Sequence, residues 1–388
     1  MKTSLFILML GIILMSSCGS GSKDKQNGTD STSKDSVAKT EAIVLNNYYN
    51  DIARFVAGMP VSDSSLLKEY TEKTEWKNYA ADIDKSWANF QKTKLDVMQP
   101  WINKELNGIN EATKDVFYPF SGPDFVYMYT FLPTAENYYM VALEPVGIIP
   151  DITKIDNSMP SFFAALNNAI KDNLNLSFFI TKSMKVQMNN EQIKGTIPVL
   201  LFFMARMNLH IQNISPATIS KEGTQVLSET EVMDKVGKKF TNGVEITFLR
   251  PGENKLSKLY YYSVSIRNDG FASMPEAEKY LKSLPTDMTT IVKSSSYCMH
   301  EDKYDKIRDI VLTHSKFLIQ DDSGVPFRFF NKENWNFGYY GIYTRPIPVF
   351  SHFYQEDLKK SWSQSAAKLS FRFGYNEESN IFVATRKK

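Results

Sequence analysis

The sequence predicts an α+β fold, with a helical N-terminal region followed by a mixed, largely antiparallel sheet with packed helices. Apolar residues recur at helical spacing between residues 45 and 106, and after Asp115 the apolar period changes to two. Further along, short strand-like and helix-like segments follow one another without the strict alternation of a doubly wound sheet. A hydrophobic content of 43% is ample for a large core.

The first residues predict a lipoprotein signal. Lys2 precedes an apolar run at residues 5–15, and Ser16 and Ser17 precede Cys18. A run of about eleven residues fits a signal peptide and is well short of the roughly 20 that a membrane-spanning helix needs. We therefore expect residues 1–17 to be cleaved and Cys18 to be acylated, with palmitate among its chains, so that the protein is anchored to a membrane. The alternative is an ordinary signal peptide that ends in cysteine.

Residues 18–41 are expected to form the lipidated cysteine and a flexible tether. The segment is rich in Gly, Ser, Thr and balanced charges and has almost no apolar side chains to bury. Gly19 after the cysteine, in place of an acidic residue, favours the outer membrane of a bacterial cell envelope.

Residues 42–114 are predicted to be the helical region. Trp76, Ile83, Trp87 and Phe90 trace one apolar stripe that is typical of core packing. Pro100 is expected to end or kink its helix because it lacks a backbone donor.

Residues 115–388 are predicted to be the α+β domain, with a further boundary allowed near 220–240. Alternation at residues 125–132 and a second run at 138–143 predict a β-hairpin. Helices are expected at 162–174, 198–214, 275–284, 304–314 and 355–362. Strands are expected in a hairpin at 244–266 and at 290–297, 316–320, 325–330, 337–343, 369–375 and 380–385.

Composition excludes several function classes. The net charge of +2 provides no basic stripe, which excludes nucleic acid as a partner. The common metalloprotease, nucleotide-binding and nucleophile-elbow motifs are absent, and four histidines are too few for a His-rich metal site. We expect no metal and no cofactor.

Two carboxylates are the first candidate site. If residues 125–143 form the predicted hairpin, Asp124 and Glu144 lie near one another at its open end. Such a pair can act as general acid and base or bind a cation. Both residues could equally be capping or solvated carboxylates at strand ends.

A second acidic pair, Asp321 and Asp322, lies between two apolar strands. The pair either forms an ordinary turn or folds toward Asp124, Glu144 and His300, which follows a strand. In the second case the crowded carboxylates would require a cation, a shared proton or a basic partner such as Arg345.

Four phrases resemble an uncharacterised family of bacterial secreted or lipid-anchored proteins. They are YPFSGPDF, LEPVG, SSSYCMHEDKYDKIRDIVLTHS and FLIQDDSGVPFRFF, and the similarity extends over residues 45–385. The family has no established activity, so the resemblance implies no catalytic role. It marks six residues as places to look for a site: Ser121, Asp124, Glu144, His300, Asp321 and Asp322.

The sequence thus favours a lipid-anchored cell-envelope protein that binds a protein or glycan ligand without chemistry, with Ser121, Asp322 and Arg345 as ligand-binding candidates, and leaves open whether it is an enzyme. The alternative is an envelope hydrolase acting on a glycan or other envelope polymer, with Asp124, Glu144, His300 and Asp321 as catalytic candidates. The hydrolase requires these four residues to share one concave site. A structural role in envelope assembly would leave them scattered.

Overall fold

The computed structural model describes residues 43–154, 158–176, 193–227, 242–375 and 379–387. The predicted signal peptide, Cys18 and the tether lie outside this part of the chain. Residues from Ile43 onward form one compact unit.

The helical N-terminal region is confirmed. It consists of α1 (Asn47–Val56), α2 (Lys68–Thr71), α3 (Thr74–Phe90), α4 (Asp96–Glu105) and α5 (Asn107–Ala112). The predicted stripe of α3 is buried, and the Trp76 indole donates to the Phe55 carbonyl at 3.1 Å. Pro100 lies inside α4, so of the two expected effects, ending or kinking the helix, the first is wrong. The departure from α geometry is the π-helical turn Gln91–Leu95 just before α4.

The sheet is mixed, which confirms the α+β class. Its order is β4-β3-β5-β6-β2-β1-β7-β8-β10-β9. Neighbours among β6, β2, β1, β7 and β8 pair in parallel, whereas the outer strands pair antiparallel. The strands are β1 (Asp115–Pro119), β2 (Asn137–Ala142), β3 (His210–Ile219), β4 (Gln225–Leu227), β5 (Gly243–Leu249), β6 (Leu256–Ser263), β7 (Met288–Val292), β8 (Ser315–Gln320), β9 (Trp335–Gly341) and β10 (Asn380–Arg386).

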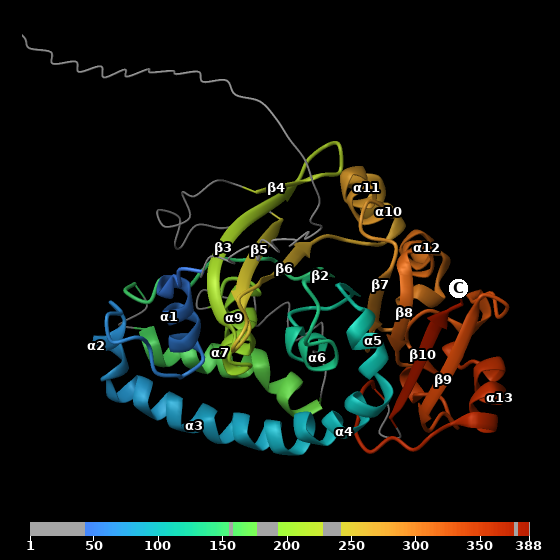
Figure 1. Cartoon of the computed structure of the whole chain (residues 1–388), viewed down its shortest axis with the longest axis horizontal. Helices are drawn as coiled ribbons and strands as arrows, with labels where there is room; N and C mark the ends of the chain where they lie inside the picture. Colours follow the sequence, from blue (N-terminus) through green and yellow to red (C-terminus); the bar gives the residue numbers. More distant parts are fainter. Residues whose placement is uncertain (1–42, 155–157, 177–192, 228–241, 376–378, 388) are drawn as a thin grey trace, which may run out of the picture. The chain divides into compact units, whose positions relative to one another are not determined.

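Apolar side chains fill a core on each face of this sheet. Successive strand residues point to opposite faces, so Val116 and Tyr118 of β1 belong to one core and Phe117 to the other. The first core is covered by the N-terminal helices with α6 (Phe125–Phe131), α7 (Met159–Leu176) and α9 (Ile197–Arg206). The second is covered by α10 (Asn268–Ser273), α11 (Pro275–Lys282), α12 (Asp305–His314) and α13 (Glu356–Ser365) (Figure 1).

The predicted hairpin at residues 125–143 is wrong in its first half. Residues 125–131 form helix α6, and β2 runs parallel to β1. Every residue of α6 is buried. A segment that is apolar on all sides carries no usable period, so alternation could not distinguish a strand from a buried helix.

Other expected elements differ in part. The helix expected at 198–214 ends at Arg206, and His210 begins β3. The segment 325–330 contains the 3-10 turn Phe327–Phe329, and 369–375 forms no strand. Helices α11, α12 and α13, the β5–β6 hairpin and strands β8, β9 and β10 lie where they were predicted, within a few residues.

Candidate functional site

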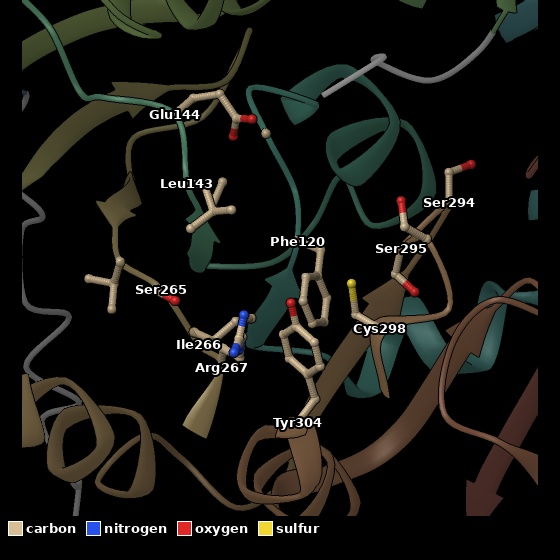
Figure 2. Close-up of a pocket in the computed structure, with 14 residues that line it drawn as sticks. Phe120, Leu143, Glu144, Ser265, Ile266, Arg267, Ser294, Ser295, Cys298 and Tyr304 are labelled. Carbon is tan, nitrogen blue, oxygen red and sulfur yellow. The ribbon is translucent and has the colours of Figure 1, made fainter. Parts of the chain in front are cut away.

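A cleft opens where several parallel strands end. Its volume is about 230 Å³, and it is formed by residues that follow the last residues of β1, β2, β6 and β7. The carboxyl ends of parallel strands are where open α/β sheets place their ligands. Figure 2 shows the lining residues Phe120, Leu143, Glu144, Ser265, Ile266, Arg267, Ser294, Ser295, Cys298 and Tyr304.

The walls of the cleft are mainly apolar and aromatic. The rings of Phe120 and Tyr304 contact edge to face, with centroids 5.7 Å apart. The Cys298 thiol and the Tyr304 hydroxyl hydrogen-bond to one another, and burial raises the pKa of both groups. Both therefore stay protonated at neutral pH, so the thiol is a weak nucleophile.

Glu144 and Arg267 are the charged residues of the lining. Glu144 follows β2 and its side chain is nearly fully buried, while the Tyr261 hydroxyl donates to its backbone carbonyl at 2.9 Å. The Arg267 guanidinium pairs with Asp269 at 2.9 Å and is half exposed. Arg267 thus takes part in an exposed ion pair, and Glu144 supplies a carboxylate to the wall.

Backbone strain is concentrated around the cleft. Phe120, Ser294, Ser296 and Tyr297 have φ angles of 60°, 52°, 54° and 56°, in the left-handed region that favours glycine. Each such residue costs about 1–3 kcal/mol and persists only where its surroundings force it, most often at functional sites. We call residues 294–297 the serine loop.

The serine loop is fastened to the acidic turn after β8. Ser294 N–H donates to Asp321 Oδ2 at 3.0 Å, and the Tyr297 hydroxyl donates to Asp322 Oδ2 at 2.6 Å. Ser295 exchanges two hydrogen bonds with Ser323, from its N–H to Ser323 Oγ at 2.9 Å and from its hydroxyl to the Ser323 carbonyl at 2.6 Å. The two sequence phrases SSSYCMHEDKYDKIRDIVLTHS and FLIQDDSGVPFRFF are therefore in direct contact in the fold.

Both acidic residues of this turn are buried. Burial and the adjacent Asp322 carboxylate raise the pKa of Asp321 to about 7, although Ser294 and Ser323 donate to its carboxylate. Burial also raises the pKa of Asp322, which accepts from Tyr297 and Asn380. Neither residue lines the cleft.

Asp124 precedes α6 and forms a buried ion pair. Its Oδ2 lies 2.5 Å from Lys293 Nζ and accepts from the Tyr118 hydroxyl at 3.0 Å, while Oδ1 accepts from Asn173 at 3.0 Å. The Lys293 ammonium also lies 4.1 Å from the centre of the Tyr127 ring. Burial raises the pKa of Asp124, and Lys293 opposes this shift.

His300 is buried beside aromatic rings rather than in the cleft. Its ring contacts those of Tyr297 and Phe353, with centroids 5.0 and 5.2 Å away. Burial and then the Arg328 charge lower the pKa of His300 to about 3. The imidazole is therefore neutral at physiological pH.

Of the four catalytic candidates, Glu144 alone lines the cleft. Asp124 accepts a hydrogen bond from the Tyr118 hydroxyl, Asp321 raises the pKa of the same hydroxyl, and the His300 ring contacts that of Tyr297. These three thus belong to a buried network beneath the serine loop.

The remaining ligand-binding candidates do not line the cleft either. Ser121 is buried, and its N–H donates to the Val141 carbonyl at 3.2 Å. Arg345 is exposed in the segment after β9.

Sequence reasoning missed several cleft residues. Arg267 lies just before α10 without a motif, and Tyr304 lies just before α12. The phrase SSSYC did contain a usable signal, because three consecutive serines after a β-branched strand indicate a functional loop.

No protein-family model, curated protein or solved structure matches this chain. None of the helices that the structure describes is long and apolar enough to cross a membrane. Among the described residues, no three His, Cys, Asp or Glu side chains are placed to hold a metal ion.

Proposed function

We propose that this chain is a lipid-anchored protein of the bacterial cell envelope whose sheet domain binds a small ligand, without chemistry, in the cleft at the carboxyl ends of its parallel strands. The single observation that supports it most is that three strained, non-glycine residues, Phe120, Ser294 and Ser296, line this cleft. A scaffold maintains such strain only where a wall must have a particular shape.

The lining suggests the class of ligand. Leu143, Val264 and Ile266 and two aromatic rings present apolar surface, while Glu144 presents a buried carboxylate. The volume of about 230 Å³ lies below the roughly 300–1,000 Å³ of sites for drug-sized molecules. A single ring with an apolar face and hydroxyl or amine donors, such as one sugar residue of an envelope glycan, fits this lining.

The hydrolase alternative is less well supported. Glycan hydrolysis uses two carboxylates that flank the bond to be broken. Asp124 is neutralised by Lys293, and neither Asp321 nor His300 lines the cleft, so the wall of the cleft holds one of the four catalytic candidates, Glu144. We therefore favour binding over catalysis.

A thermal-shift screen of the full chain in detergent tests this proposal. The panel contains monosaccharides, amino sugars and cell-wall fragments, and a ligand at a hundredfold excess over Kd should add about 2.7 kcal/mol to the free energy of unfolding. We expect Glu144→Gln to lose most of the shift and Glu75→Gln, an exposed control, to retain it. An equal shift in wild type and Glu144→Gln would contradict binding in this cleft.

A further inference from the structure

Exposed apolar side chains gather where the described part of the chain begins. Of the large apolar side chains that the structure describes, Val44 and Leu66 are the most exposed, at 86% and 84%, and Leu45 is 55% exposed. Single exposed apolar residues are ordinary, whereas neighbouring ones mark a surface that a protein or a membrane covers. We call Val44, Leu45 and Leu66 the N-terminal patch.

The three residues of the N-terminal patch belong to one face. Leu66 lines a hollow of about 330 Å³ together with Asn47 and Tyr48 of α1 and residues 150–153. Leu45 lies two residues before Asn47, so the Cα atoms of these two residues are less than about 8 Å apart. Three buried apolar side chains form the floor of the hollow: Ile52, Leu67 and Ile152.

Hydrogen bonds hold the first part of the patch on the sheet. The Asn46 side chain accepts from Tyr48 N–H at 3.0 Å and so caps α1. The Gln212 side chain of β3 accepts from Asn46 N–H at 3.1 Å and donates to the Val44 carbonyl at 2.7 Å. The backbone on both sides of Leu45 is therefore bonded to the domain, and the exposure of its neighbour Val44 is part of the fold.

The loop before α2 presents Leu66 in a similar way. The buried Asp51 carboxylate accepts from the N–H and the hydroxyl of Ser62 at 2.9 and 2.6 Å. Leu67, the next residue after Leu66, is buried against the core. The loop thus buries one leucine and exposes the other.

The polar groups beside the patch suit a boundary between water and lipid. Lys68 pairs with Asp63 at 3.0 Å, and Lys154 pairs with Asp151 at 2.7 Å, so these charges compensate one another. Tyr48 is half-buried in the lining of the hollow. A tyrosine has an apolar ring and a polar end, and it is enriched at the level of lipid headgroups for that reason.

The place of the predicted anchor selects the occupant of this face. Residues 19–42 separate Cys18 from Ile43, and they span at most about 90 Å even when fully extended. A link of this kind holds a domain beside its membrane at an effective concentration of roughly millimolar, which populates contacts that are weak on their own. The link enters the domain at Ile43, directly before Val44.

We propose that the N-terminal patch docks on the bilayer that holds the Cys18 acyl chains, with Val44 and Leu66 at headgroup level. This inference rests on the proposed lipid anchor, which brings the patch to the bilayer. Three exposed side chains are too few for stable membrane binding without an acyl chain. The patch therefore orients the anchored domain and does not replace the anchor.

Quenching by brominated lipid measures this contact in the acylated full chain. A fluorophore is attached at Leu66→Cys or at Val349→Cys, each with Cys298→Ser, and the protein is bound to phosphatidylcholine vesicles with or without bromine near the headgroups. We expect about twofold quenching at position 66, because docked apolar groups reach roughly 5–10 Å into the headgroup boundary.

Val349 is the matched control and should show almost no quenching. Its side chain is 74% exposed, and its 3-10 helix, Pro348–Phe353, directly precedes α13. Helices α2 and α13 lie at opposite ends of the domain (Figure 1). Iodide in the water should therefore quench the probe at position 349 more strongly than the probe at position 66.

Two further variants separate the patch from the label. Val44→Asp with Leu45→Asp should abolish quenching of the position 66 probe by brominated lipid, because a charged side chain resists transfer into the interface. Val349→Asp should leave that quenching unchanged. Quenching that survives the double substitution would show that the label itself enters the bilayer, and would overturn the docking.

Equal quenching by brominated lipid at positions 66 and 349 would likewise overturn the docking. A position 66 probe that is shielded from both brominated lipid and iodide would overturn it in favour of a protein partner on this face. Flotation of the vesicles reports the anchor separately. Protein that does not float would contradict the anchor and the docking together, whereas floating protein without quenching would contradict the docking alone.

Discussion

The Lys293 ammonium and the Asp124 carboxylate lie 2.5 Å apart, and their side chains are 1% and 3% exposed. Lys293 directly follows β7 and precedes the serine loop, while Asp124 precedes α6. The pair therefore joins two of the segments from which the cleft is built. Tyr118 and Asn173 supply further hydrogen bonds to the carboxylate, which offset part of its desolvation.

Removal of one partner of this pair should be strongly destabilising. Lys293→Met leaves an uncompensated buried carboxylate, and we expect a loss of about 3–5 kcal/mol in the free energy of unfolding at pH 7. The double variant Asp124→Asn with Lys293→Met should recover part of this loss. Urea denaturation of the three proteins measures both effects, and a loss below about 1 kcal/mol for the single variant would contradict the paired geometry.

His300 should make the fold less stable in mild acid. Its pKa is lowered from 6.5 to about 3 in the folded protein, so between these values the unfolded chain binds more protons and stability rises with pH. We expect wild type to lose about 2–3 kcal/mol relative to His300→Phe between pH 7 and 4.5. Denaturation at several pH values measures the difference, and a difference that is independent of pH would contradict a neutral, buried imidazole.

Backbone strain at Ser296 can be measured by comparing two substitutions. Ser296→Ala and Ser296→Gly both lose the hydroxyl, but glycine adopts φ 54° without steric cost, so Ser296→Gly should be more stable by about 1–2 kcal/mol. The same pair at Ser363 in helix α13 should show the opposite order by about 1 kcal/mol. The same order at both sites would argue against a left-handed residue at position 296.

Acylation of Cys18 remains a prediction from sequence and has a direct test. Wild-type protein expressed in a bacterium with labelled palmitate should incorporate label and sediment with membranes. Cys18→Ser should do neither, because one or more acyl chains supply the membrane affinity. Cys298→Ser is the matched control and should behave as wild type, since that thiol belongs to the folded domain. Membrane association of Cys18→Ser would indicate another anchor.

The fold class and most helices and strands outside α6 were predicted from the sequence because their apolar residues follow a recognisable pattern. The stripe of α3 presents one apolar face, and the β5–β6 hairpin is marked by the turn residues Pro251 and Gly252 between two β-rich runs, so both are readable. Helix α6 was not predicted because it is buried on every side. This error changed the predicted site, because a hairpin would place Asp124 and Glu144 next to one another. In the structure Asp124 pairs with Lys293, and Glu144 lines the cleft.

The candidate site was only partly predictable for a related reason. The phrases around Ser295 and Asp321 were recognisable, but their contact is made between strands β7 and β8 and depends on a parallel register that no local pattern specifies. The cleft itself combines the ends of four strands that are distant in sequence. Residues such as Arg267 and Tyr304 acquire their place only through that topology.

A crystallographic soak would show whether the cleft at the strand ends binds a small ligand. Crystals of the full chain in detergent would be soaked with a panel of monosaccharides and amino sugars. We expect ordered density between Phe120, Glu144 and Tyr304, with a ligand donor within hydrogen-bonding distance of the Glu144 carboxylate. An empty cleft across the panel, with any bound fragment elsewhere on the protein, would contradict it.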